Sequence, residues 1–319
     1  MTSLRVACLQ LDPTFKNPTQ SIRRADELLE GVQPGTLDFL VLPEMAFTGY
    51  CFETREDIAP FIEEVPAGKS TKWAMKTARR LGCYVQVGVP TLAPLNDLPV
   101  SSFDAPTVQD LYYNSVVLVN PFGRVETVYH KHFLYDTDKP WATAGTSFVS
   151  LDLPFPRSSP HHDSSEGAAR RTFKYAPAIC MDLNAEAFDE SLEKLEFSNF
   201  VKRKQVDLVI ASNAWLDSET VKPSDDGAEA EQVREAIQAQ DSWDEVRGLV
   251  GYWVYRMSTN LEEPGVAFVV CNRIGQEKDS TFAGSSCVVE LGDRPTVISH
   301  ASKRTEQVIV AQVRLPSRD

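Results

Sequence analysis

Short apolar runs recur along the chain, and several of them are apolar at almost every position. The clearest are 38–44 (DFLVLPE), 114–121 (NSVVLVNP) and 206–213 (VDLVIASN). A strand with two apolar faces cannot lie at a surface, so it has to be covered on both sides. Segments with helical spacing alternate with these runs. The alternation predicts an α/β fold in which helices cover buried sheets.

The same patterns predict where the elements lie. Strands are expected at 4–11, 38–44, 83–90, 114–121, 175–180, 206–213, 266–272 and 286–291, and helices at 19–32, 70–82, 193–204 and 244–260. Thr19 and Ser70 are the expected N-caps of the first two helices, and Gly82 is the expected end of the second. Three polar or proline-rich stretches are expected to be surface loops: 92–111, 156–171 and 216–232. No flexible linker divides the chain, which predicts one domain over residues 1–319.

Charge and cysteine content limit the partners and the compartment. The formal net charge of −13 argues against a nucleic-acid partner and against binding to an anionic membrane, because both require a basic face. No apolar stretch approaches the roughly 20 residues of a membrane helix. The six cysteines form no CxxC pair and no cluster with zinc spacing. Scattered thiols predict a reducing, cytoplasmic location, with all but one of them in the core.

Reactive side chains stand at the ends of three apolar runs. Glu44, Lys131 and Cys180 supply a carboxylate, an ammonium and a thiol, in that order along the chain. A thiol becomes a nucleophile when a base takes its proton, and Glu44 can be that base. Lys131 and the backbone N–H of Met181 can stabilise the resulting oxyanion. The set predicts attack on an amide or nitrile carbon, a reaction that needs no metal or other cofactor.

Each of these residues also has a structural interpretation. Glu44 alone fits a capping carboxylate at a turn, Lys131 a surface lysine, and Cys180 a buried structural cysteine. Only their conjunction favours catalysis. It also disfavours a catalytically silent interaction module, which would not need all three positions filled by competent residues.

A Cys–His pair is a further possibility for the nucleophile. His130 and His132 flank Lys131, and a second pair of histidines lies in a polar loop at 161–162. Such a pair needs one imidazole oriented by a third group, which the sequence cannot reveal.

Three segments together resemble the signature blocks of the nitrilase (carbon–nitrogen hydrolase) superfamily, in order and in spacing. They are LPEMAFTGY at 42–50, HKHFLYDTD at 130–138 and AICMDLN at 178–184. The first strand and the segment 207–216 are also similar, so the resemblance covers nearly the whole chain. It implies a four-layer α-β-β-α sandwich and a possible homodimer.

The resemblance also implies roles for single residues. It makes Glu44 the base, Lys131 the stabilising lysine and Cys180 the nucleophile. It further implies that Tyr50 and Trp215 line the pocket.

The stretch after the nucleophile resembles one branch of the superfamily more specifically. Segment 179–200 (ICMDLNAEAFDESLEKLEFSNF) is similar to fungal amidohydrolases that deamidate asparagine and glutamine at protein N-termini. Asn184 stands where many other relatives carry an arginine. The similarity implies peptides or proteins beginning with Asn or Gln as substrates, within an N-terminal degradation-signal pathway. The alternative with the same chemistry is a small-molecule amidase, nitrilase or ω-amidase.

The chain departs from the superfamily pattern at a second acidic position. Many members place another glutamate downstream of the lysine. Here Asp136 and Asp138 follow Lys131, and no glutamate occurs until Glu166. We expect Asp138 to substitute for it, or else to bind the α-ammonium of the substrate, which needs a charge partner or hydrogen-bond acceptors in a pocket.

Overall fold

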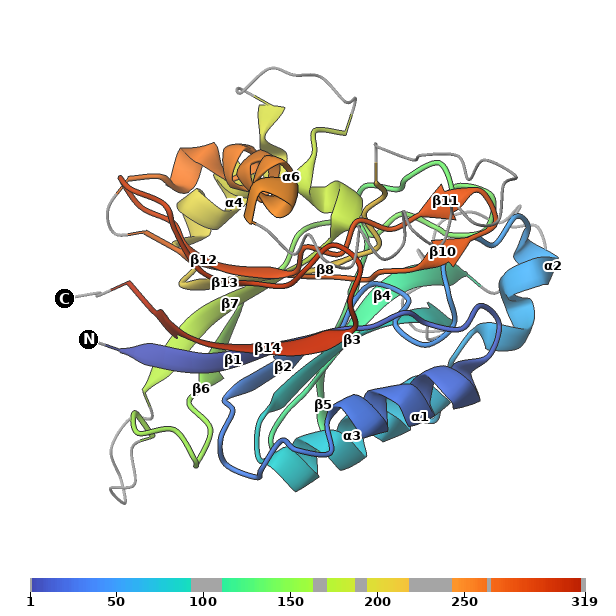
Figure 1. Cartoon of the computed structure of the whole chain (residues 1–319), viewed down its shortest axis with the longest axis horizontal. Coiled ribbons are helices and arrows are strands. Elements are labelled where there is room, and N and C mark those ends of the chain that lie inside the picture. Colours follow the sequence, from blue (N-terminus) through green and yellow to red (C-terminus); the bar gives the residue numbers. More distant parts are fainter. Residues whose placement is uncertain are drawn as a thin grey trace, which may run out of the picture.

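The computed structural model describes residues 2–92, 111–162, 171–186, 194–217, 243–262 and 265–316. Within these residues, two six-stranded sheets pack face to face, and helices cover the outer face of each sheet (Figure 1). The expected four-layer α-β-β-α sandwich is therefore confirmed. Glu166 and large parts of the three expected surface loops, namely 93–110, 163–170 and 218–232, lie outside the described residues.

The first sheet carries two helices on its outer face. Its strands are β1 (Ser3–Gln10), β2 (Phe39–Val41), β3 (Tyr84–Leu92), β4 (Tyr112–Val119), β5 (Val125–His130) and β14 (Gln307–Arg314). They lie in the order β14-β1-β2-β3-β4-β5, with β2 parallel to both neighbours and the other pairs antiparallel. The covering helices are α1 (Pro18–Leu28) and α3 (Lys69–Leu81), which pack on the sheet through apolar residues.

The second sheet has the same layered arrangement. Its strands are β6 (Leu151–Pro154), β7 (Thr172–Ile179), β8 (Leu208–Asn213), β9 (Ala267–Asn272), β12 (Cys287–Glu290) and β13 (Thr296–His300). The order is β13-β12-β9-β8-β7-β6, and β7, β8 and β9 run parallel. The helices α4 (Glu196–Lys204) and α6 (Trp243–Arg256) cover it.

Short elements complete the described chain at the edges of the sandwich. They are α2 (Arg55–Ile58), β10 (Gln276–Glu277), β11 (Ser280–Thr281) and the 3₁₀ helices η1 (Ala59–Phe61), η3 (Cys180–Leu183) and η5 (Ser258–Asn260). In the described part of the chain, no helix has both the length and the apolar character needed to cross a membrane.

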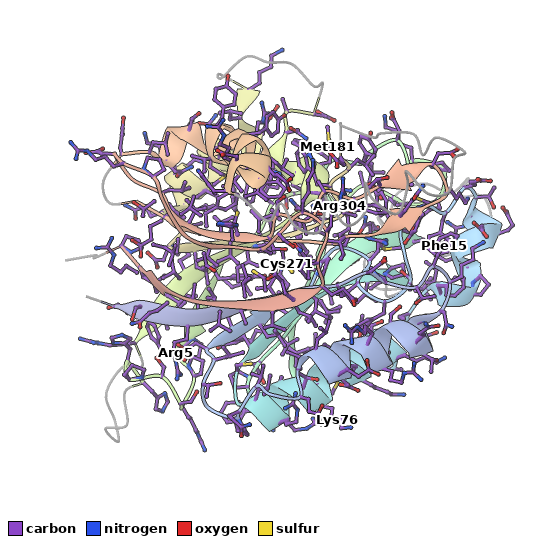
Figure 2. The ribbon with its side chains drawn as sticks, viewed as in Figure 1. Arg5, Phe15, Lys76, Met181, Cys271 and Arg304 are labelled. Atoms are coloured by element: carbon purple, nitrogen blue, oxygen red, sulfur yellow. The ribbon has the colours of Figure 1, made fainter. Side chains whose placement is uncertain are left out.

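Apolar side chains from both sheets form the central core. Phe39 on β2 stacks on Tyr175 on β7 with ring centroids 5.6 Å apart, so the two sheets are in direct contact. Cys8 and Cys271 lie in this layer, and Cys271 is labelled between the sheets in Figure 2. All six cysteines are free and buried, which agrees with the core position expected for all of them except Cys180. Burial of both faces explains why the central strands are apolar throughout.

The predicted helices are present, but two of their N-caps were wrong. Asn17 rather than Thr19 caps α1, because Pro18 occupies the first helical position, where its missing N–H costs nothing. α3 begins at Lys69 after Gly68, and Ser70 is instead held by the Glu63 carboxylate, which accepts from its N–H and its hydroxyl. Gly82 ends α3 in the left-handed conformation (φ 71°), as predicted.

Candidate active site

Three strand ends meet between the two sheets. Glu44 follows β2, Lys131 directly follows β5, and both strands belong to the first sheet. Cys180 directly follows β7 of the second sheet. Glu44 and Lys131 are 0% exposed and Cys180 is 8% exposed. The face-to-face packing of the sheets therefore brings a carboxylate, an ammonium and a thiol from distant parts of the sequence into one buried site.

Lys131 lies between two carboxylates. Its Nζ donates to Glu44 Oε1 and to Asp138 Oδ2, both at 2.6 Å. Asn114 Nδ2 donates to the same two residues, at 2.6 Å to Glu44 Oε1 and 2.9 Å to Asp138 Oδ1. We call these four residues the acid–lysine cluster. One ammonium between two carboxylates leaves a net negative charge in the cluster.

Burial and neighbouring charges shift the titration of the cluster. Burial raises the pKa of Glu44 above its ordinary value, although the Lys131 ammonium acts in the opposite direction. Burial alone would lower the pKa of Lys131, but the Asp138 and Glu44 carboxylates outweigh it and raise that pKa. Lys131 therefore stays protonated, while Glu44 is a stronger base than an exposed glutamate.

Cys180 is the first residue of η3, directly after β7, and its backbone is strained. Its φ is 44°, in the left-handed region that non-glycine residues seldom adopt. The Asn213 Oδ1 atom accepts from the Cys180 N–H at 3.0 Å and holds this turn. Burial, followed by the Glu44 carboxylate, raises the pKa of the thiol well above its ordinary value, against the effect of Lys131. The thiol is thus protonated at rest, and a base has to remove its proton before it can attack.

The backbone next to the nucleophile is also arranged around the site. The Ala214 N–H donates to Glu44 Oε2 at 2.8 Å, so Glu44 joins the loop after β8 to the cluster. Met181 is the second residue of η3, where a backbone N–H has no acceptor within the helix. This is the position at which an oxyanion next to Cys180 can be bound.

Asp182 ties the nucleophile turn to the lysine loop. Its Oδ1 accepts from the N–H groups of His132 (3.0 Å) and Phe133 (2.9 Å). Its Oδ2 accepts from the Ile179 N–H and the Tyr129 hydroxyl, both at 2.8 Å. A fully buried carboxylate with four donors fixes the turns that carry Lys131 and Cys180 relative to each other.

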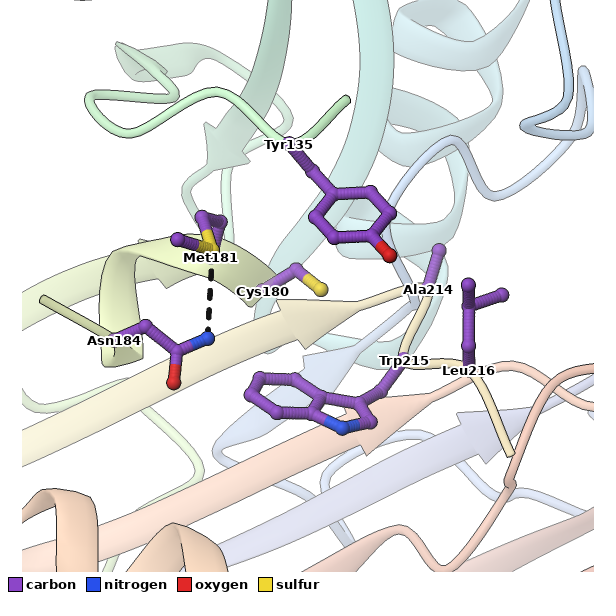
Figure 3. Close-up of a pocket in the computed structure, with 7 residues that line it drawn as sticks. All are labelled: Tyr135, Cys180, Met181, Asn184, Ala214, Trp215 and Leu216. Carbon is purple, nitrogen blue, oxygen red and sulfur yellow. Dashed lines mark hydrogen bonds between the residues drawn. The ribbon is translucent and has the colours of Figure 1, made fainter. Parts of the chain in front are cut away.

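A cavity of about 180 Å³ opens at the Cys180 thiol. Its size suits a single side chain rather than a drug-sized ligand, which needs roughly 300 Å³ or more. Figure 3 shows the residues that line it: Tyr135, Cys180, Met181, Asn184, Ala214, Trp215 and Leu216. Trp215 and Met181, two of the expected site residues, are on this wall.

Tyr50 was expected on the pocket wall, but it is not among the residues that line the described cavity, and its ring lies beside Lys131. Its ring is 1% exposed, and Lys131 Nζ is 5.7 Å from the ring centroid. Its hydroxyl is buried without a hydrogen-bond partner among the described residues. Glu277 Oε2 accepts from the N–H groups of Tyr50 (2.8 Å) and Cys51 (3.0 Å), which sets the direction of this loop.

Asp138 does not lie where it could bind the α-ammonium, and the two histidines beside Lys131 do not lie where they could pair with Cys180. Asp138 is part of the cluster and fully buried, with its oxygens taken by Lys131, Asn114 and the Tyr135 N–H (2.9 Å), so it does not face the pocket. His130 Nδ1 is 2.8 Å from Ser115 Oγ, and His132 Nδ1 is 2.6 Å from the Gly145 carbonyl oxygen. Neither histidine lines the pocket with Cys180, so a Cys–His pair is not supported.

The sequence interpretation missed Asn114, Asp182 and Asn213. Asn114 and Asn213 stand at the ends of apolar runs, as the three reactive residues do, and this placement was their only signal. Asp182 lies two residues after the nucleophile within AICMDLN. A carboxylate between apolar residues at that position indicates a buried, hydrogen-bonded acid.

Comparisons with known proteins agree with this geometry. Residues 5–318 match the family described as carbon–nitrogen hydrolase. The protein N-terminal amidase of Schizosaccharomyces pombe is 30% identical over 325 positions, which cover 96% of this chain and 98% of that protein. The protein N-terminal amidase of Saccharomyces cerevisiae is 31% identical over 227 positions, which cover 69% of this chain and 47% of that protein. A crystal structure of an N-terminal amidase with an Asn-Glu-Ala peptide superposes with a TM-score of 0.77 at 20% identity, over 99% of both chains.

Proposed function

The chain belongs to the carbon–nitrogen hydrolase family, and we propose that it deamidates asparagine or glutamine at the N-terminus of peptides and proteins. The observation that carries this proposal is the 30% identity to a protein N-terminal amidase along almost the whole of both chains. The pocket supports it, because a cavity of about 180 Å³ next to a thiol accommodates one amide side chain. The products are ammonia and an N-terminal Asp or Glu.

In the first half of the reaction, Cys180 attacks the side-chain carboxamide. Glu44 accepts the thiol proton, and the sulfur forms a bond to the carbonyl carbon. Lys131 and the Met181 N–H stabilise the negative charge that develops on the carbonyl oxygen. Glu44 then returns the proton to the amide nitrogen, the C–N bond breaks, and ammonia leaves behind a thioester on Cys180.

In the second half, water replaces the sulfur. Glu44, ionised again, accepts a proton from the water that attacks the thioester carbon. The C–S bond breaks, and the proton passes to the Cys180 sulfur while the peptide leaves with a carboxylate side chain. Asp138 and Asn114 touch no reacting atom in this scheme. Asn114 positions the two carboxylates, and Asp138 positions Lys131 and helps to keep it charged.

The proposed substrate is tested by ammonia release from matched compounds. Peptides that begin with Asn or Gln should release ammonia, whereas the same peptides with an acetylated amino terminus, and free asparagine and glutamine, should not. Release from the free amino acids would instead assign the enzyme to the small-molecule amidases. Release from acetylated peptides would show that the amino terminus is not recognised.

The pH dependence of kcat/KM should identify Glu44 as the base. The first step needs the ionised carboxylate, so kcat/KM should fall as the pH decreases through the pKa of Glu44. Burial raises that pKa, so we expect the acid limb above the ordinary glutamate value of about 4.3. Asp138→Asn removes a negative charge that also raises this pKa, so the limb should move to lower pH in that variant. An acid limb at or below about 4.3 in the wild type would contradict Glu44 as the base.

The reaction product suggests a pathway for the enzyme, and the free thiols suggest a cellular compartment. Conversion of an N-terminal amide to a carboxylate changes the residue that a degradation pathway reads, so we place the enzyme in an N-terminal degradation-signal pathway. We place it in the cytoplasm because all six cysteines, including the nucleophile, are free thiols.

A further inference from the structure

The described pocket wall offers no carboxylate to an ammonium. The α-ammonium of an N-terminal residue needs a partner when it leaves water. The side chains that line the described wall include no carboxylate and no cationic group. Glu44 and Asp138 are 0% exposed and are not among the residues that line this wall, and their oxygens accept from Lys131, Asn114 and backbone N–H groups. A second ammonium would have to compete with Lys131 for these oxygens.

Asn184 does not supply the missing acceptor. The Tyr252 hydroxyl donates to Asn184 Oδ1 at 2.6 Å, which turns the amide oxygen towards α6. The amide nitrogen faces Met181 Sδ at 3.4 Å, as Figure 3 shows. The Asn184 oxygen therefore already accepts from Tyr252, and its amide nitrogen is a donor, which cannot pair with a cation.

Two aromatic rings flank the nucleophile instead. In Figure 3, Tyr135 and Trp215 lie on opposite sides of the Cys180 thiol, and both are half-buried. Trp215 is held by Tyr252 and Trp253, whose ring centroids are 5.7 and 5.8 Å from its own. The Tyr135 backbone is held by its hydrogen bond to Asp138. The Trp215 ring is thus held by its neighbours, and the backbone that carries the Tyr135 ring is held beside the thiol.

We propose that the ring faces of Trp215 and Tyr135 bind the α-ammonium of the substrate by cation–π contacts. An aromatic face attracts a cation within roughly 6 Å of its centroid, most strongly for tryptophan and in desolvated sites. The net negative charge of the acid–lysine cluster adds to this attraction. A free amino acid would bring its α-carboxylate to the same place, where both the rings and the cluster repel it. The inference rests on the proposed function and specifies how that site recognises the substrate.

The test compares two peptides that differ only in the ammonium. One begins with Asn, and the other has a succinamoyl group in its place, which keeps the amide and lacks the α-amine. The wild type should prefer the Asn peptide in kcat/KM. Trp215→Leu should reduce this preference roughly tenfold, and Trp215→Phe should reduce it less. The succinamoyl peptide should be affected much less than the Asn peptide.

Matched variants separate the ring faces from the shape of the pocket. Tyr135→Phe keeps the ring and should keep the preference, whereas Tyr135→Leu should lower it. Leu216→Ala alters the same wall without removing a ring, so it should change both peptides in parallel. The wild-type preference should also decline above about pH 8, where an α-amine loses its proton.

Two kinetic results would overturn the inference. One is an equal loss of kcat/KM for both peptides in Trp215→Leu. The other is a wild type with the same kcat/KM for both peptides. If Trp215→Leu is too slow to assay, binding can be measured instead. The ratio of the Kd values of the two peptides is then compared between Cys180→Ala and the double variant Cys180→Ala, Trp215→Leu. An unchanged Kd ratio would also reject the ring faces. If no peptide that begins with Asn or Gln releases ammonia, the proposed function itself is rejected. That outcome differs from a failure of the ring faces alone, in which ammonia is still released.

Discussion

Replacing Cys180 with alanine is expected to abolish ammonia release, with a loss on the order of 10⁴-fold or more. Alanine has no atom that can form the thioester, and no other thiol lines the described pocket wall. The change removes one sulfur atom from a turn that Asn213 continues to hold through the backbone, so the fold should persist. Steady-state ammonia release and the free energy of unfolding in urea would measure the two effects separately.

Cys83 provides the matched control for this variant. It is also a free, fully buried thiol, and burial raises its pKa to about 12. It packs in the layer between the first sheet and its helices, away from the pocket. Cys83→Ala should keep its turnover per folded molecule. Substantial ammonia release by Cys180→Ala would contradict the proposed nucleophile.

Replacing Lys131 with methionine should both stop turnover and destabilise the protein by roughly 3–5 kcal/mol at neutral pH. Methionine fills similar space but leaves the buried Glu44 and Asp138 carboxylates without their ammonium, which is 2.6 Å from each. The oxyanion also loses a donor. Urea unfolding measures the loss of stability, and ammonia release measures the loss of activity.

The loss of stability in Lys131→Met should depend on pH. Removal of Lys131 takes away a charge that lowers the pKa of Glu44, so that pKa in the folded variant rises further above its unfolded value. A group with a raised folded pKa favours the folded state more as it becomes protonated. The stability difference between wild type and Lys131→Met should therefore shrink as the pH falls.

Lys139→Met is the control for a lysine that pairs with an aspartate at the surface. Lys139 is 62% exposed and its partner Asp136 is 80% exposed, so solvent screens their attraction. This variant should keep both its stability and its activity. A Lys131→Met protein as stable as the wild type at neutral pH would show that the cluster does not hold the charges described here.

The sequence indicated Glu44, Lys131 and Cys180 as reactive residues because each of them closely follows an apolar run. An apolar strand has to lie inside a sheet. A polar residue that follows it therefore lies where the strands of that sheet end. Asn114 could not be placed with them, because its contact with Glu44 joins β4 to the turn after β2, 70 residues apart in the chain. The pairing of strands that brings them together is a property of the whole sheet.

The direction of Tyr50 could not be predicted for a similar reason. Its backbone is held by Glu277, which lies 227 residues further along the chain and is paired with the buried Arg273. Local sequence indicated a residue near the site but not the side of Lys131 on which its ring lies. β14 was not among the expected strands, although its exposed and buried residues alternate as they do in a strand with one face towards the core.

Trapping the acyl-enzyme with hydroxylamine tests the covalent mechanism most directly. Hydroxylamine is a strong nucleophile that competes with water for a thioester. We predict that an Asn or Gln peptide turned over in its presence yields a hydroxamate at the first side chain, in a proportion that increases with hydroxylamine concentration, and that Cys180→Ala yields none. If ammonia is released at the usual rate but only the carboxylate product forms at every concentration, water attacks the amide directly and the thioester on Cys180 is excluded.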